Sequence, residues 1–397
     1  MSLKEQRLWQ ASTEGDLATV QSLLSDTSEP LNVNHHDEEH HRTVFFRACS
    51  HGRVDIVSYL VNDPRIDLNL ASSQNCSPFA IACQEGHLPI VKLLLSPQCS
   101  ERVDPTQAKG GATALFLASQ NGHVEIVQLL LADARLDVNL ARDTDKATPF
   151  YVACEKGHLD IIKLLLAHPR VEVNRSKTSG ATPFYIVCQK GFAEIAKLLV
   201  ADPRTELNAS REGGSTPAYV ICRNGHDGIL ELLLGDPRTD INLFTVYDST
   251  PLWVASQNVH LSTVRRILVY GKDVDVKRRS AEGPHVWCRK TAAEIARQAA
   301  LRPKHHTETE EEFQVIKQNG LAIAELLEAF ELDPEGVRQS TRLVPGIRGP
   351  SFSFFLFFSS FLFLLFLLHP HFGTATNPFF SFSFLFLFLF LSIFAES

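Results

Sequence analysis

The sequence is poor in the patterns that mark catalytic and metal-binding proteins. Its 397 residues include eight cysteines, and no two of them form a C-x-x-C pair, the usual arrangement in zinc and thiol redox sites. The glycine spacings of phosphate-binding loops are missing, as are H-E-x-x-H and G-x-S-x-G. We therefore predict a non-enzyme that holds neither a cofactor nor a metal ion.

Charge and targeting signals argue against further classes. The formal net charge is −7, so the chain as a whole has no electrostatic attraction for nucleic acid. The first ten residues, MSLKEQRLWQ, lack the apolar segment of a secretory signal peptide. We expect a cytoplasmic monomer that does not bind nucleic acid.

The sequence does contain one segment written seven times. A threonine or serine opens the copies at residues 43, 77, 113, 148, 182, 216 and 250, so successive copies start 34 to 36 residues apart. A glycine follows nine residues later in six copies, and Val259 stands there in the seventh. A period of this length is the pattern of a repeat protein, and it decides the fold before any local feature does.

Each copy predicts two short helices. In the copy TPFYVACEKGHLDIIKLLL, Thr148 can cap a helix that Pro149 begins and Gly157 ends. Residues 159–166 then carry apolar side chains at helical spacing. Neither helix is long enough to be stable alone, so each must bury its apolar side against the next copy.

These copies resemble the ankyrin repeat in their T-P opening, glycine turn, second helix and period. The resemblance covers residues 5–330, although Phe-Tyr or a similar pair replaces the family's Leu-His and an Asp-Pro-Arg linker recurs. It implies an all-α solenoid of helix-turn-helix repeats with short β-hairpin or extended fingers. The predicted organisation is an N-terminal capping repeat at 1–42, seven repeats at 43–270, a C-terminal capping repeat with an insertion at 271–335, a linker at 336–350, and a tail at 351–397.

Two clusters of potential ligands have simpler explanations. Five cysteines lie six residues after the opening threonine or serine, which indicates a small buried helix position rather than a reactive site. The histidine-rich segment 35–41 could capture a metal, but it has no zinc-site spacing. We interpret it as a solvated finger tip.

The tail leaves three interpretations open. Residues 351–368 and 379–394 are rich in Phe, Leu and Ser and have no charged side chain. The first run has 18 residues, close to the shortest length that can span a bilayer, so the tail could anchor the repeats to a membrane from the cytoplasmic side. Pyrimidine-rich codons encode nearly all of these residues, so the tail could instead be a translated intron, or an aggregation-prone segment.

The predicted function is a protein-interaction scaffold that binds a protein partner on the concave face of the solenoid, with a membrane-tethered version as the alternative. Variable polar residues before the turn glycine are the first candidate contacts: Gln84, Glu85, Gln120, Asn121, Glu155, Lys156, Gln189, Lys190, Arg223 and Asn224. An aromatic row is the second, at Tyr151, Tyr185 and Tyr219. This row is either a contact ladder or packing between repeats, and solvent exposure distinguishes the two.

Overall fold

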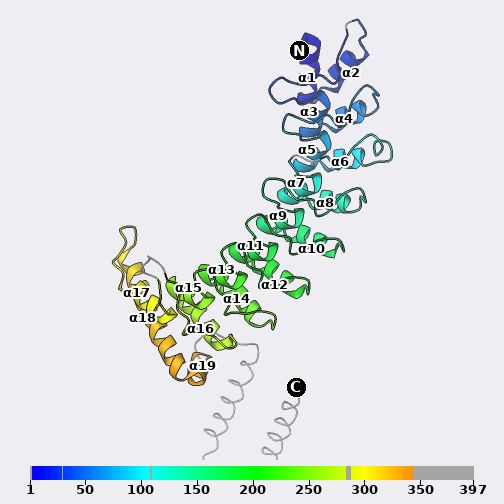
Figure 1. Cartoon of the computed structure of the whole chain (residues 1–397). Coiled ribbons are helices and arrows are strands. Elements are labelled where there is room, and N and C mark those ends of the chain that lie inside the picture. Colours follow the sequence, from blue (N-terminus) through cyan, green and yellow to red (C-terminus); the bar gives the residue numbers. More distant parts are fainter. Residues whose placement is uncertain (1, 29, 108–109, 283–287, 343–397) are drawn as a thin grey trace, which may run out of the picture. The chain divides into compact units, whose positions relative to one another are not determined.

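The computed structural model describes residues 2–28, 30–107, 110–282 and 288–342. The tail at 351–397, with its two candidate membrane segments, lies outside these ranges. Helix pairs follow one another in chain order in Figure 1 and belong to one unit, Met1–Arg338. The second unit, Gln339–Ser397, is described only as far as residue 342. No helix in the described ranges is both long enough and apolar enough to cross a bilayer.

The repeat's first helix is built as its sequence predicts. The Thr148 hydroxyl accepts a hydrogen bond from the Tyr151 backbone N–H at 3.1 Å, and the opening residue caps the helix in the same way in all seven copies. Gly157 ends the helix with φ 81°, a left-handed conformation that glycine adopts without a steric cost.

We call these helices, with the corresponding end helices, the first-helix row. Its members are α1 (Leu3–Glu14), α3 (Val44–Ser50), α5 (Pro78–Gln84), α7 (Ala114–Asn121), α9 (Pro149–Lys156), α11 (Pro183–Lys190), α13 (Pro217–Asn224), α15 (Pro251–Gln257) and α17 (Ala292–Leu301). Each one packs on the next, from α1 on α3 to α15 on α17.

The second-helix row lies behind the first. Its members are α2 (Leu17–Ser25), α4 (Val54–Leu60), α6 (Leu88–Leu94), α8 (Val124–Leu131), α10 (Leu159–Ala167), α12 (Ala193–Ala201), α14 (Asp227–Leu234), α16 (Leu261–Tyr270) and α18 (Glu310–Leu332). In α10, Ile161, Ile162 and Leu165 are fully buried. The predicted all-α helix-turn-helix solenoid is confirmed.

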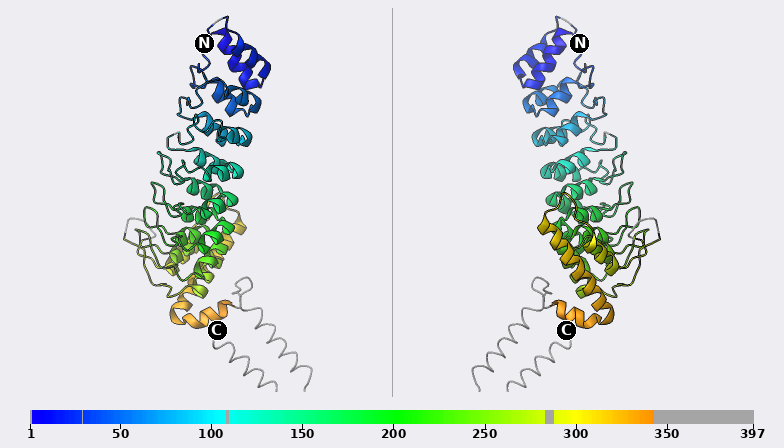
Figure 2. Two further views of the ribbon diagram at one scale, coloured as in Figure 1. Left: turned by 90° about the vertical axis from the view of Figure 1, so that its right-hand side faces the viewer. Right: turned by 90° about the vertical axis from the view of Figure 1, so that its left-hand side faces the viewer.

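Loops connect each second helix to the next first helix and project to one side of the stack, as Figure 2 shows. The short β-hairpins expected here are not confirmed: in the described ranges the loops contain turns and no strand, and an isolated bridge joins His36 and Thr43. Side chains hold neighbouring loops together instead. Asn174 Nδ2 donates to the Arg204 carbonyl, and its Oδ1 accepts from the Glu206 N–H.

The C-terminal region departs from the repeat. α17 has ten residues where the central first helices have seven or eight, and α18 has 23. The insertion expected near 302–312 forms a loop up to Thr309, which caps α18. The segment expected to be a linker from residue 336 is helical in its first part, α19 (Pro334–Arg342). Arg338 Nε donates to the Leu268 carbonyl at 3.1 Å, so Arg338, the last residue of the first unit, bonds to the C-terminal turn of α16.

Candidate functional site

The exposed-pair row consists of the two residues that precede each turn glycine, at the C-terminal end of each first helix. The second residue of each pair is exposed, including Glu85, Asn121, Lys156, Lys190 and Asn224. The first residues Gln84, Gln120 and Glu155 are half-buried, whereas Gln189 and Arg223 are exposed as well. The structure therefore places all ten predicted polar residues on the first-helix row, where a partner can reach most of them.

Some of these residues also hold the stack together. The side-chain amide of Asn121 donates to the Gln84 carbonyl at 2.9 Å, and that of Asn224 donates to the Gln189 carbonyl at 3.0 Å. Asn258, in the seventh copy, makes the same bond to the Arg223 carbonyl. Asparagine at this position is thus a link to the preceding repeat. Its recurrence at residues 121, 224 and 258 was a sequence signal for that role.

The cations of the row are less constrained. Within the described residues, Lys156, Lys190 and Arg223 have no carboxylate within ion-pair distance. Glu155 differs, because Lys177 from the following loop approaches its carboxylate at 3.2 Å. The central part of the exposed-pair row therefore presents net positive charge on a chain whose total charge is −7.

The aromatic row is mostly interior. Tyr151 and Tyr185 are each 2% exposed, and only Tyr219 is half-buried. Burial raises the pKa of the Tyr151 phenol, as expected when water cannot stabilise the phenolate. Exposures this low favour packing between repeats, so Tyr151 and Tyr185 no longer qualify as contact residues. Tyr219 alone still does.

A row of aromatic rings, not anticipated from the sequence, links the turns of successive repeats, and we call it the ring ladder. The ring of His123 donates to the Gln84 carbonyl at 2.9 Å, and His158 donates to the Gln120 carbonyl at 3.0 Å. The turn glycine of the preceding repeat leaves room for this ring: a Cβ on Gly86 would lie 2.5 Å from His123 Cε1. Histidines at 87, 226 and 260 repeat the arrangement, and Phe192 takes this place against Gly157. The recurring Gly-His pair was its sequence signal.

The recurring Asp-Pro-Arg linkers, with Asp133-Ala134-Arg135 as a variant, brace the other end of four repeats. Arg238 pairs with Asp236 at 2.8 Å, and its Nη2 donates to the Val200 carbonyl at 2.6 Å. That carbonyl lies in the last turn of α12, where backbone carbonyls have no N–H donor within the helix. The guanidinium also lowers the pKa of the Asp236 carboxyl. Arg65, Arg135 and Arg204 form the corresponding pairs.

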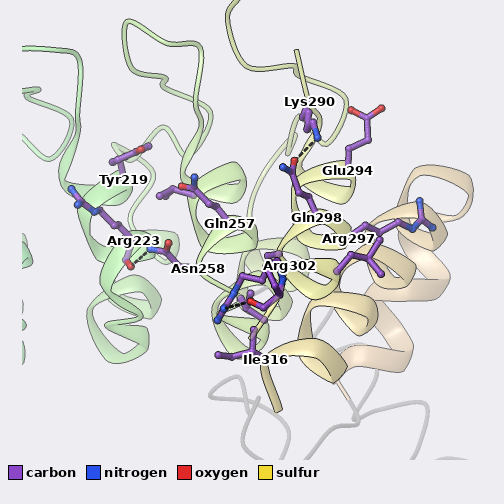
Figure 3. A pocket seen from close by; sticks show the side chains of 15 residues that line it. Tyr219, Arg223, Gln257, Asn258, Lys290, Glu294, Arg297, Gln298, Arg302 and Ile316 are labelled. Carbon is purple, nitrogen blue, oxygen red and sulfur yellow. Dashed lines mark hydrogen bonds between the residues drawn. The ribbon is translucent and has the colours of Figure 1, made fainter. Parts of the chain in front are cut away.

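A groove of about 1070 Å³ opens at the C-terminal end of the first-helix row. Figure 3 shows its walls: Tyr219 and Arg223 come from α13, Gln257 from α15, and Gln298 from α17. The loop after α17 and Ile316 of α18 complete the lining. Among the predicted residues, the structure therefore brings Tyr219 and Arg223 into one groove, and it distributes the others along the stack.

The groove carries excess positive charge. Lys290 bonds to the Gln298 amide, and no carboxylate of the described residues pairs with it. Arg302 and Arg297 line the groove but are paired with Glu308 and Glu328. The groove's single acid, Glu294, caps α17 and pairs with Arg279 at 2.9 Å. Arg223 and Lys290 are thus the groove's unpaired charges.

Its apolar part lies where the repeat pattern breaks. Val259 occupies the turn position of glycine and has φ 61°, a conformation that a β-branched residue rarely adopts. Leu301 stands at the position of the ladder histidine, but it is 72% exposed. Sequence reasoning noted Val259 without deriving a site from it, and it missed Leu301 and Lys290.

The cysteine position that five repeats share is buried, whereas Cys288, outside the seven repeats, is half-buried. Cys154 is fully buried, and burial raises the pKa of its thiol well above the ordinary range, which keeps it unreactive. Over the described ranges, no group of three or more His, Cys, Asp or Glu side chains is arranged to hold a metal ion.

The comparison with known families agrees with this architecture. A family model described as ankyrin repeats in three copies matches residues 8–107, 99–177, 115–210 and 184–278. The matches run without interruption from residue 8 to residue 278.

Proposed function

Because this chain belongs to the ankyrin-repeat family, whose repeats are generally protein-interaction modules, we propose that it is a non-catalytic adaptor. It binds another protein along the first-helix row, through the exposed-pair row and the adjoining groove. The observation that carries the proposal is the contrast within one helix. Positions that face the next repeat keep a similar residue, such as the cysteine or serine six residues after the opening threonine or serine, and the exposed pairs vary more in charge from copy to copy.

The charge distribution supports the same surface. Lys156, Lys190 and Arg223 stand on three successive first helices without acidic partners among the described residues. Exposed single charges add little to folding stability, so their removal leaves the stack intact. Interfaces gain specificity and association rate from such complementary charges.

The cellular setting belongs to the proposal too. All repeat cysteines are free and buried, which suits a reducing cytoplasmic environment. A membrane-tethered version depends on residues 351–394 alone, and no feature of the described ranges favours it. Proteins built on this fold serve many processes, so the site, rather than the fold, must identify the partner.

A site-specific photocrosslinker tests the proposal. We place it in the full chain at Gln189, which is exposed on α11, and in a matched variant at Lys197, which is exposed on α12 behind it. Irradiation in cells should give a discrete protein adduct at position 189 and none at position 197. The adduct should weaken when Lys156 and Lys190 are both replaced by alanine.

The opposite labelling pattern would contradict the proposal. Adducts formed from position 197 alone would place the interface on the second-helix row. Adducts at neither position, with the chain folded, would exclude the middle of the first-helix row as the binding surface.

A further inference from the structure

We propose that the groove between α13, α15 and α17 binds an acidic peptide segment that inserts one apolar side chain beside Val259 and Leu301. The inference rests on the proposed function and specifies the chemistry of the partner. It concerns the last junction of the stack, where three independent observations coincide: a missing ring, exposed apolar atoms and unpaired cations.

The missing ring explains why a groove exists at this junction. At six of the earlier turns, the glycine is covered by the ring at the equivalent position of the following repeat, for example Gly191 by His226 and Gly225 by His260. After α15 the next first helix does not turn at that point, because α17 continues to Leu301. No ring is supplied, and the space that it would fill remains open.

The open space is lined by apolar side chains at an energetic cost. Val259 keeps a left-handed backbone that costs on the order of 1–2 kcal/mol for a residue with a Cβ. Leu301 leaves most of its side chain in water. Ile316 of α18 and Pro303 lie in the same lining. Strained residues of this kind concentrate at binding sites, and together these side chains can cover one aliphatic or aromatic anchor.

The charges at the mouth select the rest of the ligand. Arg223 and Lys290 are the unpaired charges of the groove, and both are cationic. The cations continue away from the groove through Lys190 and Lys156 on α11 and α9. A segment with carboxylates on both sides of its apolar anchor would meet positive charge along this line, and acidic groups elsewhere on the chain would repel it.

The lining favours a peptide over a nucleic acid or a lipid surface. Among the described residues, the Gln257 side-chain amide has no hydrogen-bond partner, and the Asn258 side chain bonds only through its Nδ2, to the Arg223 carbonyl. Side-chain amides match the N–H and C=O groups of an extended backbone. Within the described part of the chain, two unpaired cations lie in the groove, whereas nucleic-acid sites neutralise many phosphates.

Selection from an unbiased peptide library tests the inference. The full chain is immobilised, and a phage library of random 12-residue peptides is enriched on it after counter-selection on the Arg223→Glu, Lys290→Glu variant. Enriched peptides should carry net negative charge and at least one large apolar residue. By fluorescence anisotropy they should bind the variant at least tenfold more weakly than the parent chain.

Single replacements separate the two parts of the site. Leu301→Asn should weaken the enriched peptides at least threefold, and an alanine in place of the peptide's apolar residue should remove that difference. Lys92→Glu, an exposed cation on α6, should change nothing. Arg223→Gln with Lys290→Gln provides a milder charge variant, and circular dichroism verifies that every variant is folded.

The inference would be overturned if no peptide were enriched over the counter-selection, or if the enriched peptides lacked acidic residues. It would also be overturned if no acidic peptide were enriched while phosphatidylserine vesicles or single-stranded DNA bound the parent chain and not the variant. An adduct at Gln189 together with any of these results would leave the proposed adaptor function intact and remove only the acidic-peptide groove.

Discussion

The arginines of the Asp-Pro-Arg linkers and the cations of the exposed-pair row have the same charge. The charged groups of the linker arginines have partners within the chain, and those of the row have none in the part of the chain that the structure describes. Arg238 lies against its own Asp236 and reaches a carbonyl of the preceding repeat. Arg223, only 15 residues earlier in the chain, has neither kind of partner for its guanidinium among the described residues. The first kind of residue recurs with the period, and the second kind changes from copy to copy.

Under the proposed function, this difference separates residues for folding from residues for recognition within each repeat. Residues that touch the neighbouring repeat have the same task at every junction, so the same chemistry recurs. The cations Lys156, Lys190 and Arg223 have no such task, because surface charges without partners contribute little to stability. Asn121 and Asn224 of the same row belong to the first group, since they bond to the preceding repeat. If this division is correct, substitutions should fall into two groups, with large stability effects in one and binding effects in the other.

The largest effect should come from the interior between repeats. Leu165 of α10 is fully buried, so Leu165→Asp places a carboxylate without a partner in an apolar seam. We expect a loss of about 4 kcal/mol in the free energy of unfolding, measured by urea titration. Lys92→Asp, at an exposed site on α6, should lose less than about 0.5 kcal/mol. Equal losses would show that α10 does not bury this face.

The turn glycines should come next. Gly191→Ala places a Cβ 2.7 Å from His226 Cε1 at φ 77°, and should cost about 2–3 kcal/mol from overpacking and backbone strain together. Gly213→Ala is a matched control, because its φ is 84° and no atom lies within 4 Å of the new Cβ. It should cost about 1 kcal/mol, the strain alone. Similar urea midpoints for both variants would mean that the packing of the His226 ring does not require a glycine at residue 191.

The two kinds of arginine can be compared directly. Arg238→Met removes the bond to Val200 and should destabilise the chain by about 1 kcal/mol, a value reduced for the partial exposure of the pair. Arg223→Met should leave the free energy of unfolding within about 0.5 kcal/mol of the parent value. Thermal unfolding followed by circular dichroism gives both numbers. A greater loss of stability in Arg223→Met than in Arg238→Met would contradict the division between the two kinds of arginine.

Acid should weaken the Asp-Pro-Arg linkers selectively. Hydrogen bonds from Arg204 and Arg238 lower the pKa values of Asp202 and Asp236 in the folded chain. Their stabilisation is present above the ordinary aspartate pKa and is lost as the pH falls through the lowered values. The double variant Asp202→Asn, Asp236→Asn should be less stable at pH 7, and should lose less stability than the parent chain between pH 5 and pH 3. Parallel pH curves would exclude these carboxylates as contributors.

The smallest stability change should occur on the exposed-pair row. Replacing both Lys156 and Lys190 by alanine should shift the free energy of unfolding by less than about 0.5 kcal/mol, while weakening the bound partner about tenfold. Calorimetry and a quantitative pull-down measure the two effects. A clear loss of stability without a binding defect would assign these lysines to the stack.

The sequence predicts the fold well because its signals are local and are repeated seven times. Thr148, Pro149 and Gly157 act within one helix, so their roles follow from propensity and capping alone. The ring ladder and the Asn121 bond join atoms of different repeats, and a single copy gives no sign of what its neighbour supplies.

The groove was harder to predict for the same reason. Val259 is visible as an exception in the seventh copy, but its meaning depends on the length of α17 and on the exposure of Leu301. For the aromatic row, the sequence left two interpretations open. Its period suits both contact and packing, and only the exposed fractions of Tyr151 and Tyr185 distinguish the two.

The ring ladder ends at the groove, so the proposed peptide site belongs to the C-terminal end of the array. Adding or deleting a repeat before α13 would leave the lining of the groove unchanged and alter its separation from the N-terminal end. A repeat added after residue 270, with glycine at 259 and a histidine to cover it, would close the groove. The number of repeats then sets the distance between the N-terminal end of the chain and the groove at its last junction.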